Sequence, residues 1–344
     1  MVSTRPLPDW MYPRTVAHRG AGKLAPENTL AAMRLGASFG YTAFEFDVKL
    51  SADGKSFLLH DTTLDRTTNG SGRADALTLG ELAQLDAGSW HGSMFAGEPL
   101  PTLASVFRYF RSNNFTANVE IKPTPGREWQ TGAAVAMDAQ LLWQDVEPLP
   151  LLSSFSETAL EAARHVVPEL PRALLLDHLP EDWLERLARL DCVALDANHR
   201  ALTAEIVRQA HASGYRVMCY TVNEPQRVDE LFRWGVDSVI TDVVNIGVGG
   251  SDLGPVMATT ALKEWSDTAI QVHFVSNMDG TQLDGLLKVL NPQTTLFIIS
   301  SKSFSTIDTF SNAKTALSWL LASHDNKATI LRRHFIGIST KTDK

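Results

Sequence analysis

The stretch that decides the fold is AFEFDVKLSADGKSFLLHD, residues 43–61. Its first part, Ala43–Leu50, is an apolar run that carries Glu45 and Asp47 at alternate positions. Side chains in a strand point to the same face at every second residue, so both carboxylates lie on one face. Two carboxylates on one face of an apolar strand predict a functional site, although a Glu-x-Asp pattern is also common on a solvated sheet face.

The second part of the stretch predicts a hairpin. Asp53-Gly54 separates the first run from a second one, Ser56–Asp61, and Asp-Gly between two apolar runs favours a two-residue turn. With that turn, His60 lies directly across from Asp47, and Glu45 is two residues along on the same face. The hairpin therefore returns a histidine to the two carboxylates.

Outward from this stretch, short apolar runs alternate with segments of helical period. Eight of the runs predict the strands of a parallel barrel: Thr15–Gly20, Ala43–Leu50, Ala117–Lys122, Pro150–Phe155, Arg172–Asp177, Val193–His199, Arg216–Val222 and Ser238–Asp242. The clearest helices have polar caps or glycine stops: Thr29–Phe39, Ser156–Val166, Leu202–Ser213 and Glu224–Trp234. An open doubly wound sheet is the alternative. The count of eight and the lack of a glycine-rich fingerprint after the first strand favour a (β/α)8 TIM barrel, with the hairpin and a small insertion, residues 62–100, after strand two.

Three carboxylates are expected at the barrel mouth, because the C-terminal ends of barrel strands form the active sites of such folds. Glu120, near the end of Ala117–Lys122, joins Glu45 and Asp47 there. Three converging carboxylates repel one another unless a cation lies between them. Oxygen ligands suit Mg²⁺ or Ca²⁺ better than zinc, so we predict one of these ions as cofactor.

The same mouth is predicted to collect histidines and cations. His18 and His60 suit general base and general acid chemistry near pH 7, although a single histidine at a strand end is more often structural. Arg19 and Lys122 are placed to neutralise the charge of a phosphate group. Convergence of all these residue types at one end of a barrel favours the functional interpretation.

These residues carry a family resemblance. Residues 10–243 contain, in order, His18-Arg19-Gly20, Ala25-Pro26-Glu27-Asn28-Thr29-Leu30, Glu45-Phe46-Asp47-Val48, His60-Asp61, Glu120-Ile121-Lys122, Tyr220-Thr221-Val222-Asn223 and Trp234-Gly235-Val236-Asp237. This combination resembles the glycerophosphodiester phosphodiesterases, most closely the small bacterial cytoplasmic ones.

The resemblance implies hydrolysis of glycerophosphodiesters to an alcohol and sn-glycerol 3-phosphate. His18 is then the base and His60 the acid, and Glu45, Asp47 and Glu120 hold the ion. Arg19 and Lys122 match phosphate-contacting positions. Phe155 either shapes the glycerol pocket or packs in the barrel core.

Near residue 244 the character of the sequence changes, and we predict two domains, residues 1–243 and 244–344. The second is an α/β unit with three strands after its start, Gln271–Ser276, Thr295–Ser300 and His334–Ser339, and the helices Gly280–Leu290 and Ser305–Ser323. It resembles part of glucose-6-phosphate isomerase through Asn245–Pro255, His273–Asn277, Asp279–Thr281 and Ser301–Thr306. We therefore expect a truncated, parallel-sheet sugar-isomerase-like unit.

In that family a serine/threonine cluster at a helix N-terminus holds the sugar phosphate. The matching positions here are Ser251, Ser301, Ser303 and Thr306. The segments that carry that family's catalytic glutamate, histidine and lysine are absent from the sequence, so the unit is expected to be catalytically inert. Apolar faces left uncovered in it favour self-association.

Composition excludes several other classes of protein. The net charge of −8 and the absence of a Lys/Arg block argue against nucleic acid or an anionic membrane as partner. The family resemblance implies a small-molecule glycerophosphodiester as substrate. The two cysteines, Cys192 and Cys219, provide no disulfide framework, and no signal peptide or long apolar span is present, so a cytoplasmic location is expected. A related barrel phospholipase and a sugar-phosphate-binding fusion protein on an inactive barrel are the alternative functions.

Overall fold

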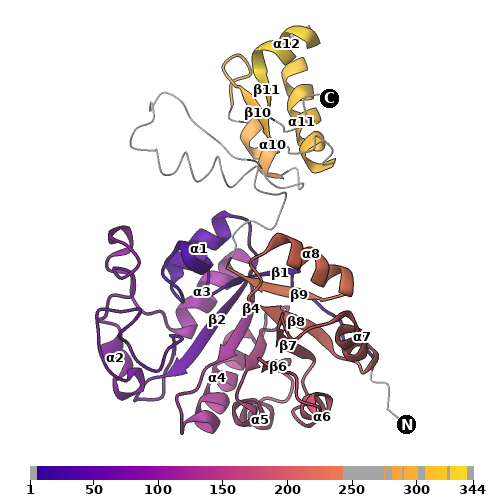
Figure 1. The fold of residues 1–344 in the computed structure, drawn as a ribbon. Helices are drawn as coiled ribbons and strands as arrows, with labels where there is room; N and C mark the ends of the chain where they lie inside the picture. Colours follow the sequence, from indigo (N-terminus) through magenta and orange to yellow (C-terminus); the bar gives the residue numbers. More distant parts are fainter. Residues whose placement is uncertain are drawn as a thin grey trace. The chain divides into compact units, whose positions relative to one another are not determined.

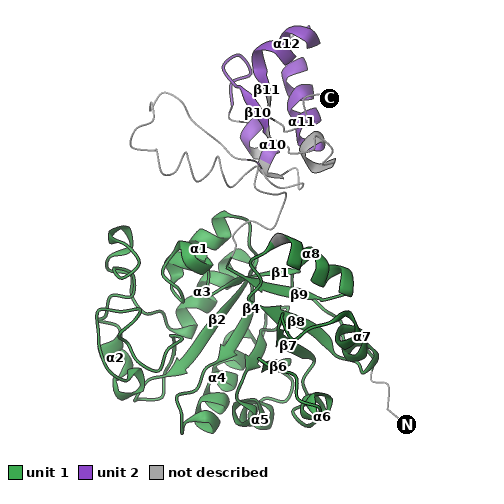
Figure 2. Ribbon diagram, viewed as in Figure 1, with its two compact units in different colours: residues 1–244 green, residues 245–344 purple. Residues whose placement is uncertain are grey.

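The computed structural model describes residues 6–242, 275, 281–288, 290–300, 307–323 and 326–338. The chain divides into two compact units, residues 1–244 and 245–344 (Figure 2). The four predicted sugar-phosphate positions, Ser251, Ser301, Ser303 and Thr306, lie outside the described residues.

Within residues 6–242, eight parallel strands close into a barrel because β1 pairs with both β2 and β9 (Figure 1). Around the barrel the order is β1-β9-β8-β7-β6-β5-β4-β2, and β3 extends the sheet by pairing antiparallel with β2. The strands are β1 Thr15–His18, β2 Ala43–Leu50, β3 Ser56–Leu58, β4 Thr116–Ile121, β5 Leu151–Ser154, β6 Arg172–Leu176, β7 Ala194–Asn198, β8 Arg216–Tyr220 and β9 Ser238–Thr241. The predicted TIM barrel is confirmed.

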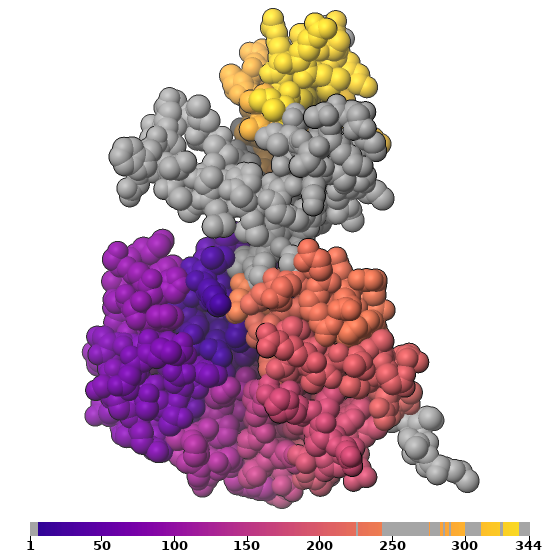
Figure 3. All heavy atoms as spheres, in the orientation of Figure 1, coloured from indigo at the N-terminus to yellow at the C-terminus, as the bar shows by residue number. Residues whose placement is uncertain are grey.

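Seven helices among the described residues cover the outside of the barrel: α1 Leu30–Ser38, α3 Leu103–Asn113, α4 Glu128–Trp143, α5 Glu157–Val166, α6 Trp183–Arg189, α7 Ala204–Ala212 and α8 Pro225–Trp234. The short helix α2, Leu79–Leu82, belongs to the insertion after the hairpin. The Ser156 side chain caps α5 as predicted, by accepting a hydrogen bond from the backbone N–H of Ala159. Gly235 ends α8 at φ 100°, a conformation that favours glycine. Consecutive βα units follow one another round the first unit, as the colours of Figure 3 show.

Side chains along each strand point alternately outward and inward, so the barrel has one core outside its sheet and another inside it. On β2, Phe44, Phe46 and Val48 pack outward against the helices in one large cluster. Inside the barrel, an apolar plug fills the end opposite the active-site mouth: Val16, Ala43, Leu151, Ala173, Ala194, Met218 and Ile240. Because Glu45 and Asp47 alternate with the outward residues, their side chains are directed to the barrel interior and are buried there.

The hairpin after β2 forms, but the predicted turn is wrong by one residue. Leu50 pairs with Ser56 and Val48 with Leu58, so Asp47 lies opposite Leu59, whose N–H donates to the Asp47 carbonyl over 3.1 Å. The loop has three residues, because the Ser51 N–H donates to the Lys55 carbonyl. Gly54 at φ 72° supplies the left-handed residue that such a loop needs.

The insertion, residues 62–100, has its own small core. Phe57 and Leu59 of the hairpin pack with Leu64, Leu82 and Leu100. The insertion contains two short 3₁₀ helices, Ala74–Ala76 and Ser93–Phe95, besides α2. Glu98 accepts a hydrogen bond from the backbone N–H of Ala31 over 2.9 Å, which attaches the insertion to α1 beside the barrel.

One polar cluster ties the last two strands together. Asp237, before β9, accepts hydrogen bonds from His211, from Arg216 and from the backbone N–H of Val217, at 2.8–2.9 Å. Burial raises the pKa of Asp237, but these hydrogen bonds outweigh it and hold the pKa below its ordinary value.

Asp237→Asn is expected to lower the free energy of unfolding by about 2–3 kcal/mol at pH 7, because charged hydrogen bonds of this kind are lost. The stabilisation by the ionised carboxylate is present above the unfolded pKa and disappears as the pH falls through the lowered folded pKa. Urea titrations at several pH values check this. A difference between wild type and variant that stays constant down to pH 3 would contradict it.

The described part of the second unit is a parallel two-stranded sheet with helices. Strand β10, Phe297–Ser300, pairs with β11, Phe335–Ile338. The helices are α10 Thr281–Leu287, α11 Ile307–Leu321 and α12 Lys327–His334. The sequence predicts each of these elements except α12, and the small parallel sheet is confirmed. None of the helices in the described residues is long and apolar enough to cross a membrane.

Candidate active site

Three buried carboxylates meet inside the barrel mouth. Glu45 and Asp47 come from β2 and Glu120 from β4, and the parallel register places Asp47 beside Glu120. One oxygen of each carboxylate lies within 4.8 Å of the others. The Glu-x-Asp pattern is therefore not a solvated sheet face here.

The electrostatics of this cluster favour a cation. Burial and the charge of Asp47 raise the pKa of Glu45 to about 8 and that of Glu120 to about 7. Burial also opposes ionisation of Asp47, but Arg19 and Lys122 outweigh it and lower the pKa of that carboxyl. Glu45 Oε1 and Asp47 Oδ1 are buried and accept no hydrogen bond from the described residues. Buried oxygens that accept no hydrogen bond, in a crowded acidic cluster, fit the ligand set of a divalent ion.

Two cationic side chains and an amide hold Asp47. Arg19 Nε lies 3.2 Å from Asp47 Oδ2, and Lys122 Nζ lies 3.6 Å from Oδ1 and donates to Glu120 over 2.6 Å. Asn28 donates to Asp47 Oδ2 over 2.8 Å and accepts from the Asp47 N–H over 3.0 Å. Asp47 is thus fixed from several sides, whereas Glu45 keeps a free oxygen.

Each histidine is held by its own aspartate. His18 Nδ1 lies 2.6 Å from Asp242 Oδ1, and Asn223 donates to the other Asp242 oxygen over 3.0 Å. Burial lowers the pKa of His18, but the hydrogen bond to Asp242 and the charge of Glu45 outweigh it and raise the pKa. Sequence reasoning missed Asp242, although it ends the predicted strand Ser238–Asp242, where functional side chains collect.

His60 lies two residues after the end of β3, in the returning arm of the hairpin. Its Nδ1 is 2.7 Å from Asp61 Oδ1. Burial lowers the pKa of His60, and the charges of Arg19 and Lys122 add to this effect. The two histidines therefore face the carboxylates from different segments of the chain, His18 from the end of β1 and His60 from the hairpin.

A further arginine, Arg66 of the insertion, joins these segments. It donates to both oxygens of Glu27 over 2.8 Å, and to both oxygens of Asp61 over 2.7 and 2.9 Å. Glu27 in turn accepts from Arg19 over 2.8 Å, and Asp61 holds His60. Arg66 thus connects the Arg19 side of the site to the His60 side.

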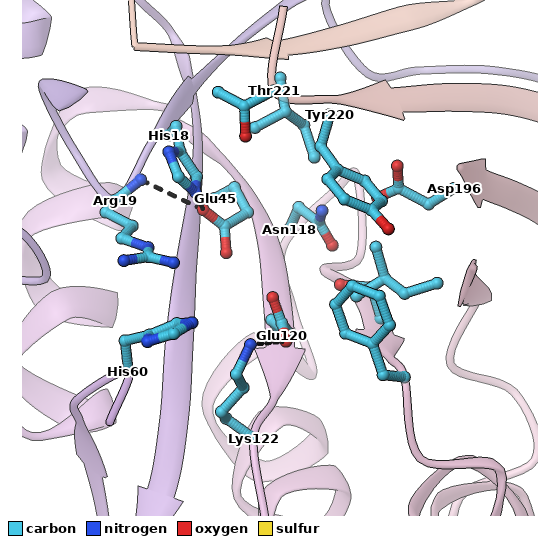
Figure 4. Close-up of a pocket in the computed structure, with 14 residues that line it drawn as sticks. His18, Arg19, Glu45, His60, Asn118, Glu120, Lys122, Asp196, Tyr220 and Thr221 are labelled. Atoms are coloured by element: carbon cyan, nitrogen blue, oxygen red, sulfur yellow. Dashed lines mark hydrogen bonds and ion pairs between the residues drawn. The ribbon is translucent and has the colours of Figure 1, made fainter. Parts of the chain in front are cut away.

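These side chains surround a pocket of about 210 Å³. Figure 4 shows His18, Arg19 and His60 on one side of it and Asp196 and Tyr220 on the other. A second, more open hollow of about 560 Å³ shares with it His60, Glu120, Lys122 and Phe155. Phe155 is 46% exposed and stacks edge-to-face with Tyr220, so it belongs to the pocket wall rather than to a packed core.

Comparison with known proteins decides the family. The model of the glycerophosphoryl diester phosphodiesterase family matches residues 18–246. A glycerophosphodiester phosphodiesterase of Caldanaerobacter subterraneus is 34% identical over 228 residues, which cover 66% of this chain and 93% of that protein. The chain belongs to the glycerophosphoryl diester phosphodiesterase family.

Solved structures agree with this membership. A phosphodiesterase from Oleispira antarctica, in complex with the product sn-glycerol-3-phosphate, has 37% identity and a TM-score of 0.63. The alignment covers 67% of this chain and 93% of that one. A glycerophosphodiester phosphodiesterase from Agrobacterium tumefaciens has 27% identity and a TM-score of 0.58, and covers 68% of this chain and 97% of that one.

The C-terminal part is similar to another family. The phosphoglucose isomerase model matches residues 201–344. A glucose-6-phosphate isomerase of Psychrobacter cryohalolentis is 59% identical over 157 residues, which are 43% of this chain and 27% of that protein. The chain spans only 26–31% of the length of such isomerase relatives. Both resemblances predicted from the sequence are confirmed.

Proposed function

We propose that this family member hydrolyses glycerophosphodiesters to an alcohol and sn-glycerol 3-phosphate, with residues 1–243 as its catalytic domain. The observation that carries the proposal is the buried cluster of Glu45, Asp47 and Glu120, whose two glutamates line one pocket together with two aspartate-held histidines. The Oleispira relative, solved with sn-glycerol-3-phosphate, supports the substrate class.

Glu45, Asp47 and Glu120 would hold one Mg²⁺ or Ca²⁺. When bound, that ion supplies positive charge that polarises the phosphoryl oxygen and stabilises the charge that develops on it. Arg19 and Lys122 lie beside the same carboxylates and add positive charge for the phosphate. The acidic cluster thus becomes a site that accepts an anionic substrate.

The two histidines would move the protons. Asp242 holds His18 Nδ1, so the nitrogen left for chemistry is Nε2, which lies 3.9 Å from Glu45 Oε2. We assign His18 as the base that takes the proton of the attacking hydroxyl group. Asp61 likewise holds His60 Nδ1, which leaves Nε2 of His60 to protonate the departing alcohol.

The two hollows suggest how a diester is oriented. The residues common to both, His60, Glu120, Lys122 and Phe155, mark the boundary between the inner pocket and the open hollow. A phosphate at this boundary would have one ester group inside the barrel and the other in the open hollow. Because His60 borders both, it is placed to protonate the alcohol that leaves on the open side.

A coupled assay for sn-glycerol 3-phosphate, with glycerophosphocholine as substrate, tests the proposal. We expect sn-glycerol 3-phosphate and choline as products, because His60 protonates the outer alcohol. Formation of glycerol and phosphocholine, or no turnover of this or other glycerophosphodiesters, would refute it. A related phospholipase activity would show instead as preference for lipids that keep their acyl chains.

Arg66→Gln is expected to lower kcat about 10- to 100-fold with little change in KM, because Glu27 and Asp61 lose the group that aligns Arg19 and His60. Arg66→Lys recovers little, since one ammonium cannot bridge four carboxylate oxygens. Steady-state kinetics measure this.

Arg73→Gln is the matched control for Arg66. Arg73 lies in the same insertion and makes a bidentate ion pair with one carboxylate, that of Asp75, at 2.9–3.0 Å. We expect the Arg73→Gln variant to have the kcat of wild type. Equal losses in the two variants would assign Arg66 to folding of the insertion rather than to positioning.

The C-terminal unit is outside this mechanism. Its predicted catalytic inertness and self-association stay predictions. So does its predicted sugar-phosphate site, whose four positions are not among the described residues.

A further inference from the structure

Three polar side chains inside the barrel have no role in the proposed hydrolysis. Asn118 is 4% exposed, and Ser153 and Asp196 are fully buried. No side-chain nitrogen or oxygen of the three forms a hydrogen bond within the described part of the chain. All three line the inner pocket. We call Asn118, Ser153 and Asp196 the polar floor.

The polar floor lies beside the carboxylates and borders the apolar plug. Ser153 and Asp196 follow the plug residues Leu151 and Ala194 by two positions on the same strand faces, so they are one step nearer the mouth. Ser153 is in register with Glu120. Asn118 is likewise in register with Glu45. Figure 4 shows Asn118 and Asp196 among the side chains that line the pocket.

Such a floor is costly unless a ligand completes it. A buried polar group without a partner is destabilising, and most buried polar groups in proteins are paired. Among the described residues, none forms an ion pair with Asp196; burial raises the pKa of its carboxyl well above the ordinary value, and the charge of Glu120 adds to this. The Ser153 hydroxyl and the Asn118 amide can each donate and accept hydrogen bonds, and the Asp196 carboxyl group accepts them in either protonation state.

Ligand hydroxyl groups can pair with the donors and acceptors of the polar floor, because each hydroxyl donates one hydrogen bond and accepts two. The floor also lies on the inner side of the boundary at which the phosphate is expected. We propose that the polar floor binds the hydroxyl groups of the alcohol that keeps the phosphate, and thereby selects a polyol phosphate over a simple alkyl phosphate. This inference rests on the proposed function for the identity of that alcohol as glycerol.

The discrimination has a physical basis. A site that hydrogen-bonds a substrate hydroxyl rejects the analogue without it, because the polar groups of the site stay unpaired. n-Propyl phosphate keeps the three carbons and the phosphate of glycerol 3-phosphate but has no hydroxyl group. It leaves the polar floor unpaired while its contacts with Arg19 and Lys122 are retained.

Isothermal titration calorimetry of the full chain with Mg²⁺ compares the two ligands directly. We expect wild type to bind sn-glycerol 3-phosphate at least about tenfold more tightly than n-propyl phosphate. Ser153→Ala and Asp196→Leu should each reduce that ratio severalfold, with the affinity for n-propyl phosphate within about twofold of wild type. Asp196→Asn, which keeps hydrogen-bonding groups, should retain most of the preference.

The neighbouring serine is the matched control. Ser154 is also fully buried, but its hydroxyl donates to the Ile121 carbonyl over 2.6 Å. Ser154→Ala should leave the ratio at the wild-type value. Should Asp196→Leu fail to fold, Ser153→Ala and Asp196→Asn still decide the question.

Two results would overturn the inference: equal affinity of wild type for both ligands, or an unchanged ratio in Ser153→Ala and Asp196→Leu, which would mean that the floor binds only water. The binding measurement needs no turnover. If the protein releases sn-glycerol 3-phosphate from glycerophosphocholine but binds both phosphates equally well, the polar-floor inference is wrong and the proposed function stands. If it prefers sn-glycerol 3-phosphate but hydrolyses no glycerophosphodiester, the proposed function is wrong and the polar-floor inference stands.

Discussion

His18→Ala is expected to lower kcat by about 10²- to 10⁴-fold, the usual contribution of a general base. The geometry behind this is the short contact of His18 Nδ1 with Asp242, 2.6 Å, which fixes the ring and leaves Nε2 toward the carboxylate cluster. The measurement is the steady-state rate of sn-glycerol 3-phosphate release with Mg²⁺ present.

Two further variants, Asp242→Asn and a substitution of an exposed histidine, serve as comparisons for His18→Ala. Asp242→Asn keeps the shape of the partner but removes its charge, so we expect a smaller loss than in His18→Ala. His178, which is 92% exposed, gives the control variant His178→Ala with a wild-type rate. A kcat of His18→Ala within about threefold of wild type would exclude His18 as a proton acceptor.

His60→Ala has the second large effect, and its size should depend on the leaving group. With choline as the departing alcohol we expect a loss of about 10²- to 10⁴-fold, because the alkoxide leaves without a proton. With p-nitrophenol in place of choline the leaving group needs no proton, so the loss should shrink to severalfold. Rates of both substrates with wild type and His60→Ala measure the difference.

The same pair of substrates separates the two histidines. His18→Ala should lose activity equally on both, since a base acts on the attacking group and not on the leaving one. If the p-nitrophenyl substrate restores activity to His18→Ala and not to His60→Ala, then His18 is the acid and His60 is the base. If it rescues neither variant, His60 does not protonate the leaving group.

The sequence predicts the barrel well, because period-two and period-3.6 patterns record which faces are buried. Ala43–Leu50 is predicted with the bounds that it has. The hairpin register could not be predicted in the same way. Asp53-Gly54 fits both a two-residue and a three-residue loop. A two-residue type I′ turn needs positive φ at both residues, whereas of the two only Gly54 has it, and the hydrogen bond from Ser51 to Lys55 closes the longer loop.

The site residues at the C-terminal ends of the strands could be predicted from the sequence. His18, Glu45 and Glu120 were found from their positions at the mouth of a barrel. Arg66 and Asn28 could not be found from strand patterns, because each lies in a loop and reaches the site only through tertiary contacts. A single polar residue in an apolar run, such as Asp196 in Val193–His199, likewise gives no periodic signal.

Chelation tests the central claim most directly, namely that Glu45, Asp47 and Glu120 form the ion site of a glycerophosphodiester phosphodiesterase. The measurement is release of sn-glycerol 3-phosphate from glycerophosphocholine, with and without EDTA, followed by addition of Mg²⁺ or Ca²⁺. We predict that EDTA abolishes release, that excess Mg²⁺ or Ca²⁺ restores it in wild type, and that neither restores it in Glu45→Ala. Full activity in excess chelator would contradict the account.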